Sequence, residues 1–584
     1  MLKYSWKFSK PYVVSVFLLQ LVSSILPLAG IVLPKYIIDE LLGYRRPQQM
    51  IVLIAILTGC NLVAGLLMSY FRGKSFTSKN VVFCKFQTMI AEKLALCDFE
   101  QLENPEFLDI KERAGKFLYA NGQGFGVVLD SAVNILGKFI TFIGIIAIIL
   151  TLNVWIVLVF IALVFLNALV DFYVKKNYVK WDMEKAPIER KTGYFIRLVE
   201  DFSFGKEIRL FNLRSWIVQK ISNHLNIANE FYGKQTTEYN KSYYFNSLTG
   251  FIREAFSYGY LSFRVIYGFI GVGDFTMYIS AIAQFSSAMN DVMQSILNIK
   301  QFGSYYDALE KYMNIPTTMR SGKTKLDKSN SGEYVIKFDN VSFKYAGSSH
   351  FALRNINITI YGKEKITIVG ENGAGKSTFV KLLCRLYKPT EGTIFLNGID
   401  IQEIEYDSYM SMIAPVFQDY KLFSFSVKEN IAFSASNHVA DERIINLLES
   451  SGFGGKLANL ENGIHTHIYK NFELDGFEPS GGEGQKLSIA RALYKDAPIV
   501  VLDEPTAALD PRAEFEIYQK FHSLTLGRSA IYVSHRLAIS KLCDNVAVFS
   551  NGEMIEYGSH HELLSRKGLY YELYSMQAQF YTES

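Results

Sequence analysis

Long apolar segments dominate the first half of the chain, and a mixed helix and strand pattern follows them. A helix needs roughly 20 apolar residues to cross a bilayer. Segments that meet this length occupy residues 12–38, 51–71, 132–152, 154–173, 251–270 and 275–297. Short turns join the third segment to the fourth and the fifth to the sixth. We therefore predict a membrane domain of six spanning helices.

The two long connectors, residues 72–131 and 174–250, are basic and mix charged with apolar residues at helical spacing. The positive-inside rule places such connectors in the cytoplasm, although Arg45 and Arg46 lie on the other side and run against it. We expect the spanning helices to continue below the bilayer, with short crossing pieces near residues 103–109 and 209–214. The first segment is too long for a signal-peptide core, so it should stay in the mature protein.

Residues 316–332 are polar and rich in residues that break helices and strands, which predicts a linker. The membrane domain would then occupy residues 1–315 and a second domain residues 333–584. Alternation in segments such as 334–338 predicts strands of βαβ units in that second domain. The fold class is thus an all-α membrane domain plus a soluble α/β domain.

Composition gives no support for nucleic-acid binding, for disulfide bonds or for a cysteine metal site. The net charge of +4 is small for 584 residues, which gives no reason to expect a nucleic-acid partner. The five cysteines are scattered and form no CxxC pair, so we expect reduced thiols rather than disulfides or a metal site.

One glycine-rich segment carries the main chemistry. It lies between a strand-like stretch, 366–369, and a helix-like one, 379–386. Glycines allow backbone N–H groups to close around phosphates, Lys376 can reach the terminal phosphates, and Ser377 can offer a hydroxyl group to Mg²⁺. The pattern predicts a P-loop domain that binds a nucleoside triphosphate with Mg²⁺ through Gly370, Asn372, Gly373, Ala374, Gly375, Lys376, Ser377 and Thr378.

A second acidic element follows the apolar strand-like segment 499–502. Asp503 would hold Mg²⁺, and Glu504 would polarise the attacking water. The alternative is an ordinary strand that ends at a helix cap, and the phosphate loop upstream favours the catalytic interpretation.

With these motifs the chain resembles the ATP-binding cassette (ABC) exporter half-transporters, in which six spanning helices precede one nucleotide-binding domain. The resemblance covers essentially the whole chain, and it is most specific between Tyr345 and His535. It implies that Tyr345 stacks on adenine and that Gln418 contacts Mg²⁺ and the γ-phosphate. His535 would also contact the γ-phosphate, and Asp510 would belong to the loop that crosses between two nucleotide-binding domains.

The family signature corresponds to residues 480–485, in which the resemblance implies that Ser480, Gly481 and Gly482 grip ATP held by a second subunit. A homodimer and a heterodimer both fit. Pro479 replaces the usual leucine, and Glu483 replaces the usual glutamine. A carboxylate at Glu483 would lie unfavourably close to ATP unless it points away or pairs. We expect the site to remain competent for ATP hydrolysis.

Polar residues in the last two spanning segments indicate where substrate could bind. Gln284, Ser287 and Asp291 recur at steps of three and four, so they share one stripe of a helix. This stripe would line the translocation cavity or pack against the partner. Arg253 and Arg264 fall on one face of the preceding segment, where they would attract an anionic or peptide substrate, unless Arg253 only snorkels. Our candidate substrate contacts are Gln284, Ser287, Asp291 and Arg264.

These features predict a multi-pass protein of the cell membrane with its nucleotide-binding domain in the cytoplasm. It would use ATP to export a peptide, drug-like or lipid-like substrate by alternating access. A lipid or glycolipid flippase with the same ATPase is the first alternative. An ATP-gated membrane regulator that does not pump is a more distant one. The partners would be a second half-transporter, the bilayer and a substrate that the sequence does not identify.

Overall fold

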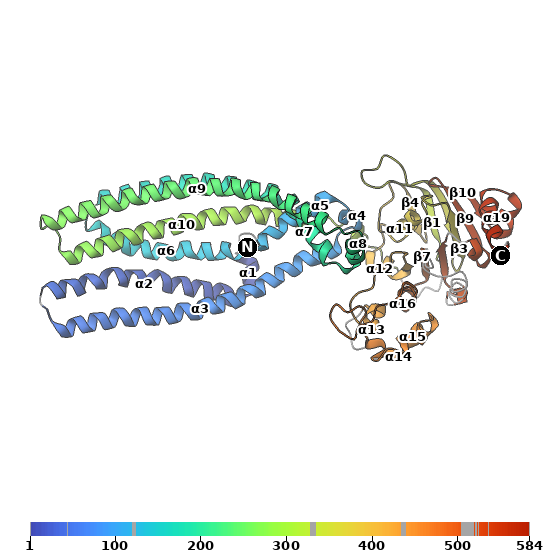
Figure 1. Cartoon of the computed structure of the whole chain (residues 1–584), viewed down its shortest axis with the longest axis horizontal. Coiled ribbons are helices and arrows are strands. Elements are labelled where there is room, and N and C mark those ends of the chain that lie inside the picture. The colour runs from blue at the N-terminus through green and yellow to red at the C-terminus, as the bar shows by residue number, and fades with distance from the viewer. Residues whose placement is uncertain are drawn as a thin grey trace. The chain divides into compact units, whose positions relative to one another are not determined.

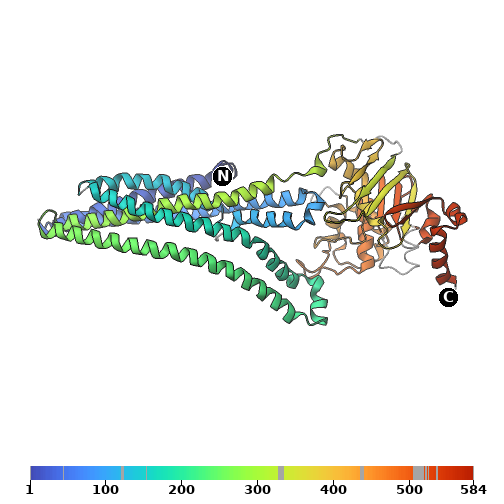
Figure 2. The same cartoon turned by 90° about the horizontal axis from the view of Figure 1, so that it is seen from above.

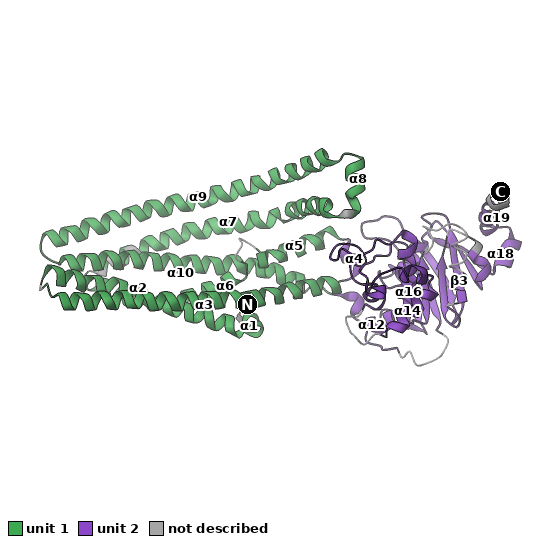
Figure 3. Ribbon diagram, turned by 60° about the horizontal axis from the view of Figure 1, so that its bottom comes forward, with its two compact units in different colours: residues 1–97, 104–316 green, residues 98–103, 317–584 purple. Residues whose placement is uncertain are grey.

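The computed structural model describes residues 2–43, 45–119, 124–152, 154–326, 334–433, 440–503, 519, 522–523, 525–534 and 537–582. The chain forms two compact units, coloured separately in Figure 3. The first comprises residues 1–97 and 104–316, and the second comprises residues 98–103 and 317–584. The regular structure of the first unit's described residues is entirely helical, whereas the second unit contains two β-sheets.

Long helices that lie alongside one another make up the first unit (Figure 1). They are α2 (Lys10–Leu42), α3 (Pro47–Leu96), α6 (Gly126–Leu150), α7 (Val154–Glu200), α9 (Arg214–Ile266) and α10 (Val272–Met313). Shorter elements are α1 (Leu2–Phe8), α5 (Pro105–Tyr119), η2 (Phe202–Phe204) and α8 (Gly205–Leu210). In Figure 2 the α7 and α9 ribbons, teal and green, run together and separate from the other long helices toward α8.

The apolar character of these helices is uneven. Among the described residues, three helices are long and apolar enough to cross a membrane by length and composition: α2, α3 and α6. The helices α7, α9 and α10 contain the other predicted spans, but polar residues such as Asp171, Arg253 and Gln284 interrupt them. Polar groups in a membrane helix need protein or water around them, so we expect the polar residues of these three helices to face protein or water.

The crossing pieces lie at slightly different positions from those predicted. The first is α4 (Phe99–Leu102), which belongs to the second unit, whereas residues 105–109 already form the start of α5. Pro105 suits the first position of a helix, and the Asn104 side chain accepts a hydrogen bond from the Glu106 backbone N–H at 2.8 Å. The second crossing piece is η2 with α8, so it begins before the predicted residues 209–214. The helix α9 also ends at Ile266, four residues before the predicted 270.

The second unit contains two sheets. The four-stranded sheet is antiparallel and has the order β2 (Leu353–Ile360), β1 (Ile336–Phe343), β4 (Glu391–Leu396) and β5 (Ile399–Asp400). The six-stranded sheet has the order β10 (Glu553–Gly558), β9 (Asn545–Ser550), β3 (Lys365–Gly370), β8 (Ser529–Val533), β7 (Ile499–Asp503) and β6 (Ile413–Val416). Only β10 is antiparallel to its neighbour, and strands such as β7 are buried along their whole length, as parallel strands covered on both faces are.

Helices of the second unit cover these sheets and form a small helical subdomain. They are α11 (Lys376–Leu383), α12 (Tyr406–Met412), α13 (Val427–Ala432), α14 (Asp441–Ser450), α15 (Gly454–Leu457), α16 (Gly481–Tyr494), α18 (His560–Arg566) and α19 (Leu569–Thr582), with short 3-10 helices η3 (Thr318–Arg320), η4 (Gly463–His465) and η5 (Leu537–Leu542). Phe379 of α11 stacks on Phe338 of β1, with ring centroids 4.3 Å apart, which joins the helix to the smaller sheet. A separate apolar cluster that includes Val427, Ile444 and Leu487 holds α13, α14 and α16 together.

The segment predicted as a linker is packed in its first part. Thr324 forms a bridge with Ile404, and the Asp98 carboxylate accepts hydrogen bonds from the Thr318 backbone N–H at 2.8 Å and its hydroxyl group at 2.7 Å. Polar, breaker-rich composition signals the lack of a helix or strand, but it does not report such packing. Residues 327–333 of the segment lie outside the described residues.

Candidate ATP-binding site

The glycine-rich loop lies between the end of β3 and the start of α11, and glycines are required at two of its positions. Gly375 has φ of 100°, and a Cβ atom there would lie 2.7 Å from the Ala352 carbonyl oxygen. Gly370 has φ of 147°, and a Cβ atom there would collide with the Phe549 carbonyl oxygen. Only a residue without a side chain fits both constraints. The loop can therefore keep its backbone N–H groups exposed toward a ligand.

Lys376 lies across this loop. Its ammonium group donates hydrogen bonds to the Gly370 carbonyl oxygen at 3.0 Å and the Glu371 carbonyl oxygen at 2.8 Å. The residue is 5% exposed, so its stem is packed and its charged end is held by the loop carbonyl oxygens. A cation held at this place lies beside the position where a loop of this type receives phosphates.

The predicted nucleotide contacts gather around one cavity of about 790 Å³. Its walls are formed by Tyr345, Ala352, Asn372, Gly373, Gly375, Lys376, Ser377, Thr378 and Gln418. Tyr345 reaches it from the loop after β1, and its hydroxyl group lies 3.1 Å from the Thr378 hydroxyl group. Gln418 reaches it from the loop after β6. Ala374 of the same loop is buried, 3% exposed.

Two side chains whose oxygen atoms could bind a metal ion lie together at one edge of the loop. The Ser377 hydroxyl group donates a hydrogen bond to the Asp503 carboxylate at 3.3 Å, and Asp503 ends the buried strand β7. The Gln418 side chain adds an amide oxygen to the same cavity. Hydroxyl, carboxylate and amide oxygens are the donors that Mg²⁺ takes in proteins, usually with one or two carboxylates beside substrate phosphates. The set fits Mg²⁺.

Three predicted catalytic or contact residues, Glu504, Asp510 and His535, lie outside the described residues. Their roles therefore remain predictions from the sequence.

The signature segment forms the N-terminus of α16. Ser480 is the N-cap residue, and its hydroxyl group accepts a hydrogen bond from the Glu483 backbone N–H at 3.3 Å. In return the Glu483 carboxylate accepts one from the Ser480 backbone N–H at 2.8 Å, which completes a capping box. Gly481 and Gly482 form the first turn of the helix, and the Gly481 carbonyl oxygen accepts a hydrogen bond from Tyr420 at 2.7 Å.

Glu483 also has a cationic partner, since Lys456 lies 3.3 Å from its second carboxylate oxygen. Burial acts to raise the pKa of Glu483, but the hydrogen bonds from Ser480 and the nearby Lys456 outweigh burial and hold the pKa below its ordinary value. The carboxylate that looked unfavourable beside ATP is thus paired within its own domain.

Sequence reasoning missed a contact between the first crossing piece and the ATP-binding domain. The Tyr387 hydroxyl group donates a hydrogen bond to the Glu103 carboxylate at 2.6 Å, and Phe99 of α4 packs edge-on against the Tyr387 ring at 5.6 Å. Burial, followed by the Glu103 carboxylate, raises the pKa of Tyr387 well above its ordinary value, so the phenol stays a donor. The Tyr345 ring lies 5.4 Å away. No local sequence pattern signals this pair.

In the membrane domain, the candidate substrate residues have different surroundings. Asp291 forms an ion pair with Lys138 of α6 at 2.7 Å, while Gln284 and Ser287 on the same helix are exposed. The Arg264 guanidinium lies 5.0 Å from the Phe269 ring. Among the described residues, no hydrogen bond or ion pair joins Arg264 to the α10 stripe, so the structure does not bring these four candidates into one site.

A second polar group in this domain also escaped the sequence analysis. The buried Asp171 of α7 accepts hydrogen bonds from Asn246 at 3.2 Å and from Gln294 at 2.7 Å, which links α7 with α9 and α10. One turn earlier, Asn167 accepts a hydrogen bond from Thr249 at 2.9 Å. The signal was present, because Asn167 and Asp171 are four residues apart inside the apolar segment 154–173.

Comparison with known proteins found a family model and several relatives. A family model described as ABC transporter matches residues 353–507. The subtilin transport ATP-binding protein SpaT of Bacillus subtilis is 29% identical over 572 residues, covering 94% of this chain and 89% of the relative. The nisin transport ATP-binding protein NisT of Lactococcus lactis subsp. lactis is 28% identical over 582 residues, covering 98% and 95%.

Two further matches concern a flippase and a solved structure. The ATP-dependent lipid A-core flippase of Alcanivorax borkumensis is 30% identical over 454 residues, covering 76% of this chain and 75% of the relative. The structure of a bacterial Atm1-family ABC exporter with ATP bound superimposes with a TM-score of 0.81 at 21% identity, covering 97% of this chain and 98% of that chain. This last likeness concerns the fold. The chain therefore belongs to the ABC transporter family, as an ATP-driven exporter in which a multi-pass membrane domain is joined to an ATP-binding ATPase domain.

Proposed function

We propose that this chain pairs with a second half-transporter, binds two ATP molecules with Mg²⁺ between the paired ATPase domains, and exports a peptide from the cytoplasm. The domains would be a membrane domain over residues 1–315, a linker over 316–332 and a nucleotide-binding domain over 333–584. The support comes from the built phosphate loop, the capped signature helix and relatives that match nearly the full chain.

For ATP binding, we assign the phosphates to the loop around Gly373 and Lys376 and the adenine to Tyr345. These residues line one cavity, and the Lys376 ammonium is held over the loop by two carbonyl oxygens. Mg²⁺ would be held by Ser377, Asp503 and Gln418, whose side chains supply oxygen donors at the same edge. When bound, the ion would neutralise charge on the phosphates.

For hydrolysis, Glu504 orients the attacking water and accepts its proton as the terminal phosphoryl group leaves the bridging oxygen. His535 and Lys376 contact the γ-phosphate and stabilise charge there. Ser480, Gly481 and Gly482 grip ATP held by the partner, because the N-terminus of α16 presents backbone N–H groups and a partial positive charge. By the family resemblance, Asp510 would belong to the loop that crosses between the two ATPase domains.

For the substrate, the single observation that carries the proposal is the extent of the match to SpaT and NisT. These relatives transport subtilin and nisin, which are peptides, and their alignments include the membrane domain because they cover 94% and 98% of the chain. A lipid flippase is the second candidate, and the relative at 30% identity favours it. Its alignment covers 76% of the chain. Gln284, Ser287, Asp291 and Arg264 remain our proposed substrate contacts.

The proposal is tested with the full chain in inside-out vesicles. Fluorescently labelled nisin and a fluorescent phospholipid are supplied in parallel reactions with ATP and Mg²⁺, and movement of each across the membrane is measured. Peptide accumulation that requires ATP supports peptide export. Lipid movement without peptide accumulation supports the flippase and overturns the peptide proposal. Stoichiometry is measured by native mass spectrometry, where a species of two half-transporters is expected and a monomer under ATP would contradict pairing.

A further inference from the structure

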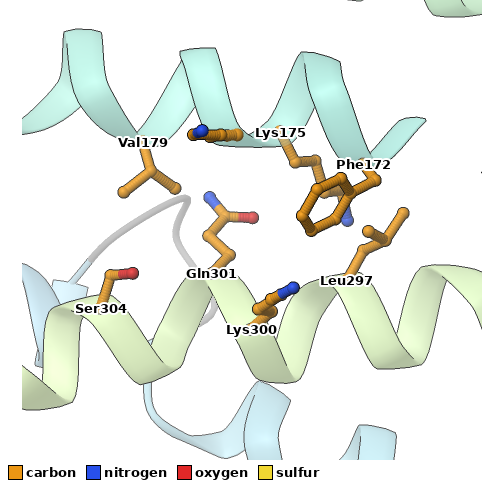
Figure 4. Close-up of a pocket in the computed structure, with 8 residues that line it drawn as sticks. Phe172, Lys175, Val179, Leu297, Lys300, Gln301 and Ser304 are labelled. Atoms are coloured by element: carbon orange, nitrogen blue, oxygen red, sulfur yellow. The ribbon is translucent and has the colours of Figure 1, made fainter. Parts of the chain in front are cut away.

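A second cavity lies inside the first unit, between α7 and α10 (Figure 4). Its volume is about 280 Å³, and it is lined by Phe172, Lys175, Lys176, Val179, Leu297, Lys300, Gln301 and Ser304. These residues lie at and just after the ends of the predicted spans 154–173 and 275–297. The cavity is therefore placed where the two helices leave the hydrocarbon region on the basic, inner side of the membrane.

The lining of this cavity contains three lysine residues and no acidic residue. Within the described part of the chain, Lys175, Lys176 and Lys300 form no ion pair within 4 Å, and no Asp or Glu residue lines the cavity. Lys175 instead donates a hydrogen bond to Asn298 at 2.6 Å, and Lys300 lies 4.0 Å from the Phe172 ring centroid. The cavity is thus suited to a negatively charged group.

Acidic residues lie nearby on α7, but their partners are other residues. Asp171, one turn before Lys175, accepts hydrogen bonds from Asn246 and Gln294. Asp182 pairs with Lys116 at 3.1 Å and Lys185 at 3.5 Å. Asp171 offsets part of the Lys175 charge, which leaves Lys176 and Lys300 as the main cations of the cavity.

Gln301 gives an independent indication of a ligand. It is 4% exposed, and its amide nitrogen has no hydrogen-bond partner of good geometry among the described residues. The neighbouring Tyr305 hydroxyl group donates to Asp182 and also interacts with the Gln301 amide, which leaves that amide a second N–H group to donate. Figure 4 shows the Gln301 amide projecting into the space between the two helices. A buried donor without a partner is uncommon unless a ligand or water satisfies it.

Apolar side chains complete the lining. Phe172 and Leu297 lie on the side of the cavity toward the predicted spans, and Val179 lies one to two turns further along α7. An anionic group bound by the lysines and Gln301 would therefore have hydrocarbon surface directly beside it. This combination matches an amphipathic anion and not a free inorganic ion.

We propose that this cavity binds the phosphate headgroup of an anionic phospholipid from the inner leaflet, with Lys176, Lys300 and the Gln301 amide as its ligands. The acyl chains would leave the cavity past Phe172 and Leu297. The lipid bridges α7 and α10 at a site separate from the ATP-binding loop. This site does not depend on which substrate the protein exports.

The test uses the full chain reconstituted in nanodiscs of phosphatidylcholine with a minor fraction of phosphatidylglycerol. Native mass spectrometry after extraction counts the phosphatidylglycerol molecules that each protein retains. In the variant Lys176→Ala/Lys300→Ala, we expect retention to fall about tenfold, because two charge-assisted contacts to the phosphate are lost. The matched control Lys180→Ala/Lys311→Ala removes exposed lysines from the same two helices outside the cavity, and it should retain phosphatidylglycerol like the wild type.

A second variant covers the case in which the double variant does not fold. Gln301→Leu removes the amide donor but keeps the volume, and it should also lower retention of phosphatidylglycerol without changing retention of phosphatidylcholine. Equal retention in the cavity variants, or an equal loss in the control, would overturn the proposal. Displacement of bound lipid by labelled nisin would also overturn it, since the cavity would then be a peptide site. Peptide transport measured on the same samples reports separately on the exported substrate.

Discussion

The carboxylate of Glu483 accepts a hydrogen bond from the backbone N–H of Ser480 at 2.8 Å, and its second oxygen lies 3.3 Å from the Lys456 ammonium. Ser480 is the serine of the signature. Glu483 departs from the family pattern, but its carboxylate stabilises the position of Ser480, which keeps that pattern. Glu483 therefore stabilises the N-terminus of α16, in addition to its effect on nucleotide binding. Its charge remains near the helix end that we propose contacts the partner's ATP.

The first prediction concerns this charge. Glu483→Gln keeps an oxygen that can accept the Ser480 hydrogen bond but removes the ion pair with Lys456. We expect the unfolding free energy to fall by less than about 1 kcal/mol, as for other partly exposed pairs. The apparent affinity for ATP should rise a few-fold, since one negative charge near the phosphates is gone. Steady-state ATPase assays and thermal unfolding measure the two effects. Glu478→Gln is the control, because it makes the same charge change at an exposed upstream position. A weaker ATP affinity in Glu483→Gln would contradict the argument.

The second prediction concerns pH. The pKa of Glu483 is lowered in the folded chain, so the ionised carboxylate stabilises the fold. This contribution is complete above the unfolded-state pKa of about 4.3 and is lost as pH falls through the lower folded-state pKa. The gap in unfolding temperature between the wild type and Glu483→Gln should therefore be constant near neutral pH and close in acid. Unfolding of the full chain in detergent at a series of pH values tests this. A gap that widened in acid would have the wrong sign.

The third prediction concerns Tyr387. Tyr387→Phe keeps the ring packed against Phe99 but removes the hydrogen bond to Glu103. We expect ATP binding to be unchanged and the amount of substrate moved per ATP hydrolysed to fall severalfold, because the first crossing piece is held less firmly. A hydrogen bond to a charged group contributes about 1.5–3 kcal/mol. Tyr361→Phe is the control, since Tyr361 is 60% exposed. An unchanged ratio of transport to hydrolysis would remove Tyr387 from the coupling path.

The fourth prediction concerns the ion pair between Asp291 and Lys138. Asp291→Ala leaves a lysine without its partner inside the membrane domain, so we expect lower thermal stability and little transport. In Lys138→Ala/Asp291→Ala the unpaired charge is gone, so stability should recover, whereas transport should stay low because the proposed substrate contact of Asp291 is still missing. Thermal unfolding and vesicle transport of the single and double variants are compared. If transport recovers together with stability, Asp291 acts only through its pair with Lys138 and is not a substrate contact.

The phosphate loop was predictable because its chemistry is local: glycines, a lysine and a hydroxyl residue follow one another between a strand and a helix. The ends of helices were less predictable. For example, α5 begins at Pro105, inside the segment predicted to be the first crossing piece. Contacts such as Tyr387 with Glu103 join residues 284 positions apart, and no local pattern encodes them. The orientation of Glu483 was also open, because a carboxylate at that position can turn toward the ligand or back to its own N-cap.

The central claim is that ATP hydrolysis at this site drives a substrate across the membrane. It is tested most directly by ATP-dependent accumulation of labelled nisin in inside-out vesicles that contain the wild type, Glu504→Gln or Lys376→Ala, with ATP binding measured on the same vesicles. The account predicts accumulation only in the wild type, retained ATP binding in Glu504→Gln, and lost ATP binding in Lys376→Ala. Accumulation in Glu504→Gln at the wild-type rate would contradict it.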